Sequence, residues 1–149
     1  MKISKQYIAG FVDGEGYFGL IKKSSKVCTR GYYYTPVLKI AQACKNDGVL
    51  RAIKEFIGYG NLEFRKSLKP NISDSSSLEF RGMKRVVPII DKLLPYLIVK
   101  KKQAELLKEF SKIKIGRTGY SYDIETDRKR TEIYHKVRFL NKRGLAETE

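Results

Sequence analysis

The first apolar residues of the chain recur at the spacing of a helix. They stand at positions 7, 8, 11 and 12, with the small pair Ala9 and Gly10 between them. Apolar residues three and four positions apart share one face of a helix, so we expect a short helix over residues 5–12. Gly14 and Gly16 should end this helix, because glycine is poorly suited to a helix interior.

The next two segments alternate apolar and polar residues in the manner of strands. Residues 17–23 are expected to form the first, with Phe18 and Leu20 on one face. A turn rich in lysine and serine follows, and a second strand is expected over residues 32–41. Because alternate residues of a strand face opposite ways, Tyr34 is expected to point into the core while Tyr33 points away from it.

The pattern then repeats. A second helix is expected to begin after Asn46, whose side chain can cap a free amide, and to end at Gly58. Strands around Leu62 and Leu78 flank a turn-forming loop over residues 69–77, and a helix is predicted over residues 83–94. The order αββαββα predicts an α+β fold, in which helices cover the apolar face of a four-stranded antiparallel sheet.

Two C-terminal helices complete the predicted fold. The first carries an apolar stripe formed by Val99, Leu106, Leu107, Phe110 and Ile113. After an irregular segment over residues 116–123, the second runs from about residue 127 to 143 and carries Ile133, Val137 and Leu140. We expect one domain over residues 1–149, with a core at about 5–112 and a helical extension at about 113–149.

Composition adds a strong constraint on the partner. Thirty-one lysines and arginines stand against 16 acidic residues, which leaves a net charge of +15. Such a surplus predicts a polyanionic partner. No apolar run is long enough for a secretion signal or a membrane span, so we expect an intracellular protein without a membrane partner. Two cysteines and one histidine cannot form a four-ligand zinc site, which excludes a zinc finger.

The polar face of the predicted sheet is the expected contact surface for DNA. Its side chains include both hydrogen-bond donors and acceptors, and they are net positive, as contact with phosphates and base edges requires. The predicted DNA-binding residues are Tyr17, Lys23, Tyr33, Thr35, Lys39, Glu63, Arg65, Ser67, Ser77, Glu79 and Arg81.

Residues 8–16, which read Ile-Ala-Gly-Phe-Val-Asp-Gly-Glu-Gly, carry the candidate chemistry. Ala9 and Gly10 have almost no side chain, so two copies of this helix can approach closely. Close approach would bring together the helix ends, where Asp13 and Glu15 stand. Carboxylate oxygens are ligands that Mg²⁺ prefers, and two such acids facing DNA phosphates need cations between them.

This motif resembles the signature of the LAGLIDADG homing endonucleases, and the resemblance extends over about residues 5–112. One motif in a chain of this length implies the homodimeric branch. It also implies cleavage of long, pseudo-palindromic double-stranded DNA with Mg²⁺, for which Mn²⁺ or Ca²⁺ can substitute in binding. The implied products have short 3′ overhangs, and the implied role is that of an intron-encoded enzyme.

The resemblance also assigns roles to single residues. Glu15 and the backbone carbonyl of Gly14 would bind metal, whereas Asp13 would position the helix ends. Gln42 takes the place of a polar residue near the attacking water, and Lys100 takes the place of an active-site lysine. Many family members have Asp at the position of Glu15, and a second basic residue of the family is replaced here by Asn46.

These features also fit other interpretations. Residues 8–16 could be an ordinary helix that ends at glycine, and the protein could be an RNA-binding intron maturase or a catalytically silent DNA-binding regulator. His135 is expected at the surface. The basic residues of the last helix either form a solvated face or contact phosphates; they are Arg128, Lys129, Arg130, Lys136, Arg138, Lys142 and Arg143.

Overall fold

The computed structural model of the chain describes residues 2–28, 30–113 and 123–142. Its elements follow the predicted order αββαββα and then two C-terminal helices, which confirms the fold class. They are α1 (Lys5–Glu15), β1 (Gly16–Ser24), β2 (Tyr32–Ala43), α2 (Gly48–Ile57), β3 (Asn61–Arg65), β4 (Ser75–Arg81), α3 (Met83–Leu93), α4 (Lys101–Lys112) and α5 (Ile124–Leu140). Short 3-10 turns span Cys44–Asn46 and Leu94–Tyr96.

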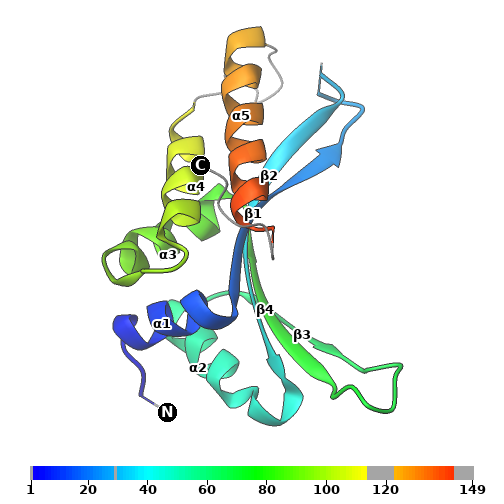
Figure 1. The fold of residues 1–149 in the computed structure, drawn as a ribbon, viewed down its shortest axis with the longest axis vertical. Helices are drawn as coiled ribbons and strands as arrows, with labels where there is room; N and C mark the ends of the chain where they lie inside the picture. The colour runs from blue at the N-terminus through cyan, green and yellow to red at the C-terminus, as the bar shows by residue number, and fades with distance from the viewer. Residues whose placement is uncertain (1, 29, 114–122, 143–149) are drawn as a thin grey trace.

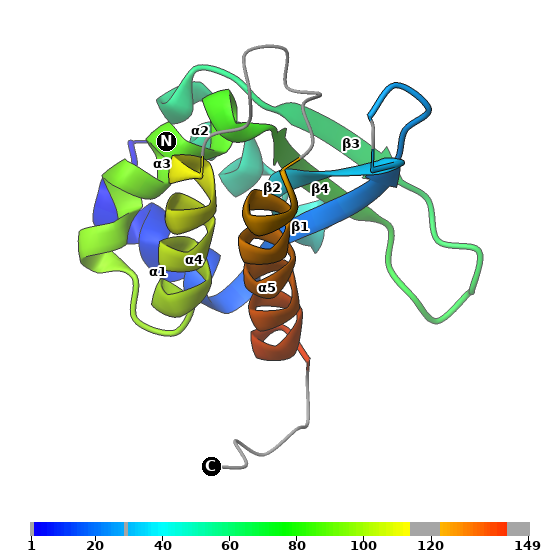
Figure 2. The same ribbon diagram turned by 90° about the horizontal axis from the view of Figure 1, so that it is seen from above.

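The four strands form one antiparallel sheet in the order β1-β2-β4-β3. The helices lie on one side of this sheet, and the other side is open (Figures 1 and 2). The register places Phe18, Leu38 and Phe80 side by side across three strands. All three are fully buried, so the strands are aligned by their shared contact with the helices.

The hydrophobic core lies between this sheet face and the helices. Every helix contributes apolar side chains to it, as the spacing of apolar residues predicts. The buried helical residues include Ile8 and Val12 of α1, Leu50 and Ile53 of α2, Ile89 and Ile90 of α3, Leu107 and Phe110 of α4, and Ile133 and Val137 of α5. Tyr34 is buried among them, as predicted, and it stacks near Tyr134 of α5 with 4.8 Å between the ring centroids.

The first helix is longer than predicted, since it continues through Gly14 to Glu15. Only Gly16 ends it, and a Cβ at Gly16 would lie 2.7 Å from the Val12 carbonyl oxygen. Glycine inside a helix costs about 1 kcal/mol, and tertiary contacts at the last turn outweigh that cost. Both acids of the motif therefore belong to the helix itself.

Two predictions around the second helix were wrong. Asn46 does not cap α2, because it belongs to a 3-10 turn and the cap position is Asp47. The Asp47 carboxylate contacts Arg51 and accepts a hydrogen bond from the Ser76 hydroxyl instead of capping the helix. The loop before β4 is also shorter than predicted, since Ser75 already pairs with Arg65.

The C-terminal helices also differ from the prediction at their starts. Val99 is exposed and precedes α4, which begins at Lys101. The last helix begins three residues early, because the Asp123 side chain accepts a hydrogen bond from the Glu125 amide. Arg130 is buried, so its assignment to a solvated or phosphate-contacting face was wrong. Arg143 and most of the segment expected to be irregular lie outside the described residues.

None of the described helices combines the length and the apolar character that a membrane span requires.

We expect Phe80→Ala to lower the free energy of unfolding by about 3–5 kcal/mol, because it leaves a cavity where three strands meet. Urea unfolding followed by circular dichroism measures the change. Leu68→Ala is the matched control, since Leu68 is 99% exposed and its truncation should leave stability nearly unchanged. Equal losses in the two variants would contradict the position assigned to the core.

Candidate active site and nucleic-acid interface

The carboxylate of Asp13 ties the end of α1 to the segment before α4. One of its oxygens accepts a hydrogen bond from the Ile98 amide at 2.8 Å, and the other accepts one from the Lys100 amide at 2.9 Å. These amides precede a helix and would otherwise lack partners within it. Because both carboxylate oxygens are engaged, the geometry supports a positioning role for Asp13.

The side chain of Lys100 caps the same helix end from the other direction. Its ammonium donates to the carbonyl oxygens of Val12 at 3.1 Å and Asp13 at 2.5 Å. The Val12 carbonyl also accepts a hydrogen bond from the Gly16 amide, whereas the last carbonyls of a helix lack partners within it and carry partial negative charge, so a cation is favoured there. The predicted active-site lysine therefore lies at the end of α1, one residue from Gly14.

Gly14 and Glu15 are the exposed residues at this helix end. The Glu15 carboxylate and the Gly14 carbonyl are hard oxygen donors, which fit Mg²⁺. Among the described residues, however, no group of three or more His, Cys, Asp or Glu side chains could hold a metal ion. One protomer thus provides an incomplete set of ligands, and the rest would have to come from a second copy or from bound phosphate.

Gln42 lies on the helix-covered side of the sheet, near the junction of α1 and β1. Gly16 pairs with Ile40, and Gln42 stands two residues further along β2 on the same face as Ile40. Its amide oxygen accepts a hydrogen bond from the Ala43 amide at 2.9 Å. This engagement does not test the catalytic role predicted for Gln42, which stays a prediction.

The small residues of α1 divide between two faces of the helix. Ala9 is fully buried in its own protomer, so its assignment to a contact with a second copy was wrong. Gly10 and Gly14 lie on the opposite, exposed face, where an added Cβ would meet nothing within 4 Å. Tyr7 and Phe11 share this face, and their rings stack with 6.3 Å between centroids. We call Tyr7, Gly10, Phe11 and Gly14 the outer face of α1.

Apolar side chains continue this surface beyond α1. Ile98 is 84% exposed and Val99 is also exposed, and Asp13 holds their segment against the end of the helix. Sequence reasoning predicted Gly10 as a contact between copies but missed the apolar part of this surface, because it placed Tyr7, Phe11 and Val99 in apolar stripes without separating the residues that face the core. Nothing in a helical period distinguishes residues that face the core from residues that face a partner.

The open face of the sheet carries the predicted DNA-binding residues in ordered rows. Tyr17, Lys39 and Glu79 are cross-strand neighbours, and Asn61 continues the row on β3. Asn61 was missed because its strand was predicted from Leu62 onward. Ser67 was placed wrongly, since β3 ends at Arg65; the Ser67 amide donates to Asp74 within the loop between β3 and β4.

Polar contacts along the strands organise this face. Arg81 forms an ion pair with Glu79 at 2.7 Å, and Asn61 donates to Glu63 at 2.8 Å. Each contact joins residues two apart, which point to the same side of a strand. The ring of Tyr17 lies over Gly19, where a Cβ would come within 2.4 Å of the ring. The face therefore presents both donors and acceptors, with its acids partly neutralised.

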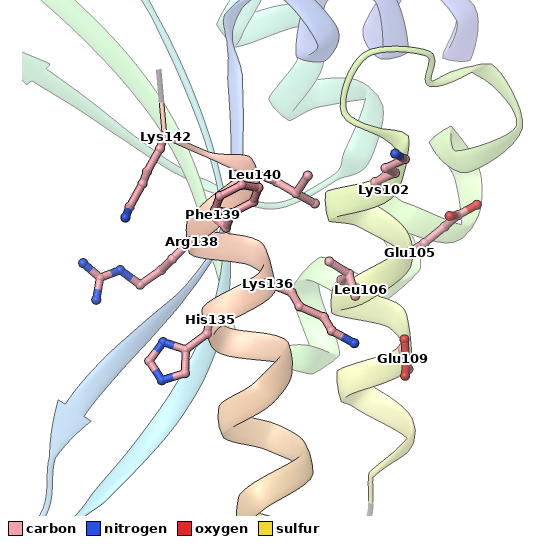
Figure 3. Close-up of a pocket in the computed structure, with 10 residues that line it drawn as sticks. All are labelled: Lys102, Glu105, Leu106, Glu109, His135, Lys136, Arg138, Phe139, Leu140 and Lys142. Carbon is pink, nitrogen blue, oxygen red and sulfur yellow. The ribbon is translucent and has the colours of Figure 1, made fainter. Parts of the chain in front are cut away.

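A groove of about 780 Å³ lies between α4 and α5 (Figure 3). Its lining includes Leu106 and the acids Glu105 and Glu109 from α4, together with Phe139 and Lys136 from α5. None of the predicted catalytic residues lines it. The candidate active site is therefore the end of α1 rather than this groove.

Comparison with known proteins agrees with this arrangement. The family model described as "LAGLIDADG endonuclease" matches residues 8–113. The structure of the homing endonuclease I-CvuI in complex with its target, in the presence of Ca, is 25% identical with a TM-score of 0.77, over 97% of this chain and 85% of that one. The archaeal intron-encoded homing endonuclease I-Vdi141I, complexed with DNA, is 24% identical with a TM-score of 0.75, over 97% and 88%. A search of curated proteins finds no match to the chain.

We expect Asp13→Asn to lower the free energy of unfolding by about 1–3 kcal/mol, because an amide side chain can accept from only one of the two backbone N–H groups. Thermal and urea unfolding measure the loss. Asp91→Asn is the control, since Asp91 is an exposed partner of Lys108 and its ion pair contributes little. An Asp13→Asn protein as stable as the Asp91→Asn protein would contradict the positioning role.

Proposed function

Because this chain belongs to the LAGLIDADG endonuclease family, we propose that it is a site-specific endonuclease that cuts both strands of duplex DNA as a homodimer. The observation that carries the proposal is the exposed Glu15 carboxylate at the end of a helix whose outer face is open. I-CvuI and I-Vdi141I, which share the fold, were solved with their target and with DNA, respectively.

The outer face of α1 is the proposed contact between the two copies. Gly10 and Gly14 leave room for the backbone of a second helix, and Tyr7 and Phe11 supply apolar area beside them. In a two-fold dimer the same face of each copy meets itself. Contact along this face brings the two Glu15 side chains together above one DNA site.

In this arrangement, Glu15 and the Gly14 carbonyl of each copy hold divalent cations against the DNA backbone, with Mg²⁺ as the physiological ion and Mn²⁺ or Ca²⁺ able to support binding. I-CvuI complexes were obtained with Mg and with Ca. Bound cations supply an activated water and stabilise charge at phosphorus and on the leaving oxygen. Asp13 fixes the helix end that carries Glu15, Lys100 holds positive charge beside it, and Gln42 borders the junction of α1 and β1.

The open face of the sheet is the proposed surface that reads the DNA. Starting at Gly16, the nine residues of β1 extend away from Glu15 by roughly 26 Å at about 3.3 Å per residue. At about 3.4 Å per step of the duplex, this corresponds to about eight base pairs. Residues near the α1 end, such as Tyr17 and Lys39, then face the inner part of a half-site, and Lys23 and Tyr33 face its outer part.

The biological setting follows from the same family. We propose a long, pseudo-palindromic target, products with short 3′ overhangs, and a role in the spread of the intron that encodes the enzyme. I-Vdi141I is itself described as intron-encoded. Since the substrate is DNA, we place the enzyme in a cell compartment that contains DNA. Residues 1–149 act in this proposal as one endonuclease domain, with the C-terminal helices as an extension of its core.

Glu15→Gln tests the catalytic proposal. The variant should lose Mg²⁺-dependent cleavage of a plasmid that carries the target, and it should still bind the target duplex in Ca²⁺ with nearly unchanged affinity. The carboxylate charge is lost while the size of the side chain is kept. Plasmid linearisation and gel-shift titration measure the two properties, and Glu55→Gln on the exposed side of α2 is the control.

Cleavage by the Glu15→Gln variant at the wild-type rate would contradict the metal-binding role assigned to Glu15. If the wild-type protein binds the site and never cuts it, the silent regulator becomes the better description. If it binds the intron RNA and not the DNA site, an RNA-binding maturase becomes the better description.

Gly10→Leu tests the dimer. The new side chain meets no atom of its own protomer within 4 Å of its Cβ, and leucine favours a helix over glycine by about 1 kcal/mol. The variant should therefore fold at least as well as the wild type but sediment as a monomer and fail to cut both strands. Gly48→Leu is the control, because Gly48 is also a helical glycine with open space around it. A Gly10→Leu protein that remains dimeric would contradict the proposed interface.

A further inference from the structure

The last helix packs against the hairpin of β1 and β2 and runs beside it in Figure 1. Near the hairpin tip, the Tyr32 hydroxyl donates to Asp127 at 2.7 Å, and the Tyr34 hydroxyl shares a hydrogen bond of 2.9 Å with Thr131. At the other end of α5, the side-chain amide of Asn141 donates to the Phe18 carbonyl at 2.7 Å. The helix is thus connected to both strands by specific polar contacts, and not only by apolar packing.

The contact near the tip contains buried charges that nothing in the proposed reaction uses. Arg30 and Asp127 form an ion pair with 3.5 Å between Arg30 Nε and Asp127 Oδ1. Arg130 is 1% exposed, and its guanidinium lies 4.3 Å from the ring centre of Phe110. The structure gives no hydrogen-bond partner to Arg130 Nε and Nη1. Asp127 is the carboxylate that pairs with Arg30, and its charge also favours the charged form of Arg130. We call Arg30, Tyr32, Asp127 and Arg130 the Asp127 cluster.

The titration behaviour of the cluster reflects this burial. Loss of solvent, and then the nearby Arg30, lower the pKa of Arg130 to about 10. Burial, followed by the hydrogen bond to Asp127, raises the pKa of Tyr32 to about 12. A pKa of about 10 still leaves Arg130 charged at neutral pH, and the nearby Asp127 carboxylate offsets that charge. Removing its charge leaves buried cations without compensation, which loosens the contact between α5 and the hairpin.

The same strands present their other side chains to the open face of the sheet. Tyr33 lies between Tyr32 and Tyr34, which both contact α5, and it points the opposite way. Lys23 pairs with Tyr33 across the hairpin. A rotation or shift of the hairpin against α5 therefore moves Lys23 and Tyr33, whereas the α1 end of the sheet is held separately by Asp13 and Lys100.

We propose that α5, through the Asp127 cluster, sets the orientation of the β1–β2 hairpin and thereby determines selectivity for the outer base pairs of each half-site. The proposal rests on the proposed DNA endonuclease function. It makes Asp127 a positioning residue, which acts through Lys23 and Tyr33 and does not itself touch DNA. Inner base pairs and the cutting step depend on the other end of the sheet and should not respond.

The test compares base discrimination along the half-site in Asp127→Asn and wild-type protein. A target is first selected from a randomised duplex library with the wild type, and each position is then substituted in turn. Competition binding in Ca²⁺ gives the affinity ratio at each position, and a wrong base pair costs the wild type about 5- to 150-fold. In Asp127→Asn, the ratios at outer positions should fall to about 3-fold or less, while inner ratios and Mg²⁺-dependent cleavage remain.

Glu132→Gln is the matched control, because Glu132 is on the same helix and forms only an exposed ion pair with Lys136. Tyr32→Phe is the milder variant, since it removes one hydrogen bond to Asp127 and keeps the ring. In Tyr32→Phe, the affinity ratios at the outer base pairs should fall by less than in Asp127→Asn. If Asp127→Asn does not fold by circular dichroism, the Tyr32→Phe profile decides the question alone.

Two results would overturn the proposal. One is unchanged base discrimination along the half-site in folded variants. The other is an equal loss of discrimination at inner and outer positions, which indicates a general structural role. Failure of the proposed function looks different. In that case the wild-type protein itself selects no duplex from the library and cuts none.

Discussion

The structure depends on the way one helix end is held. The last turn of α1 contains Gly14, a residue that does not favour helix, and it ends in carbonyls without partners in the helix. Asp13 binds two backbone amides of the segment before α4, and the Lys100 ammonium binds the carbonyls of Val12 and Asp13. These contacts join the first helix to a segment more than eighty residues away in the sequence. They fix the direction in which Glu15 leaves the helix, and β1 starts from there.

Because alternate residues of each strand face opposite sides, the side chains of the core and those of the open face lie on different sides of the sheet. Phe18, Leu38 and Phe80 lie in one row on the covered side of the sheet, and Tyr17, Lys39 and Glu79 lie in the neighbouring row on the open side. Substitutions on the open side therefore change the proposed DNA-binding surface and leave the core intact. The separation is incomplete in the β1–β2 hairpin, where the covered side carries tyrosines and buried charges as well as apolar residues. Polar contacts have directional geometry, so they fix an orientation more narrowly than apolar packing does.

The sequence was sufficient to predict the order of elements, the sheet and the two faces of its strands, because these follow from local periods of two and 3.6 residues. Errors occurred where distant contacts decide the outcome. Gly14 remains helical because Asp13 and Lys100 hold the last turn, and Asp47 turns to Ser76 instead of capping α2. Arg130 was assigned to the surface because its charge is visible in the sequence, while its cover, the ring of Phe110, comes from another helix. Gly10 was predicted to allow contact between two copies, but Tyr7 and Phe11 of the outer face were missed, since an apolar period does not reveal which apolar side chains meet the core.

Having a single exposed carboxylate at the proposed site makes activity conditional on assembly. A protomer that carried a complete ligand set could bind cations and attack phosphodiesters at any place where it met DNA. Here the described residues of one copy contain no such set. In the proposed dimer, the ligands become sufficient only when two helix ends meet over a duplex that supplies its own phosphate oxygens. Since the two sheets can follow the DNA only where both half-sites fit, recognition and metal binding are completed by the same event. The proposed close approach of α1 to its mate is therefore a condition for specificity as well as for cutting.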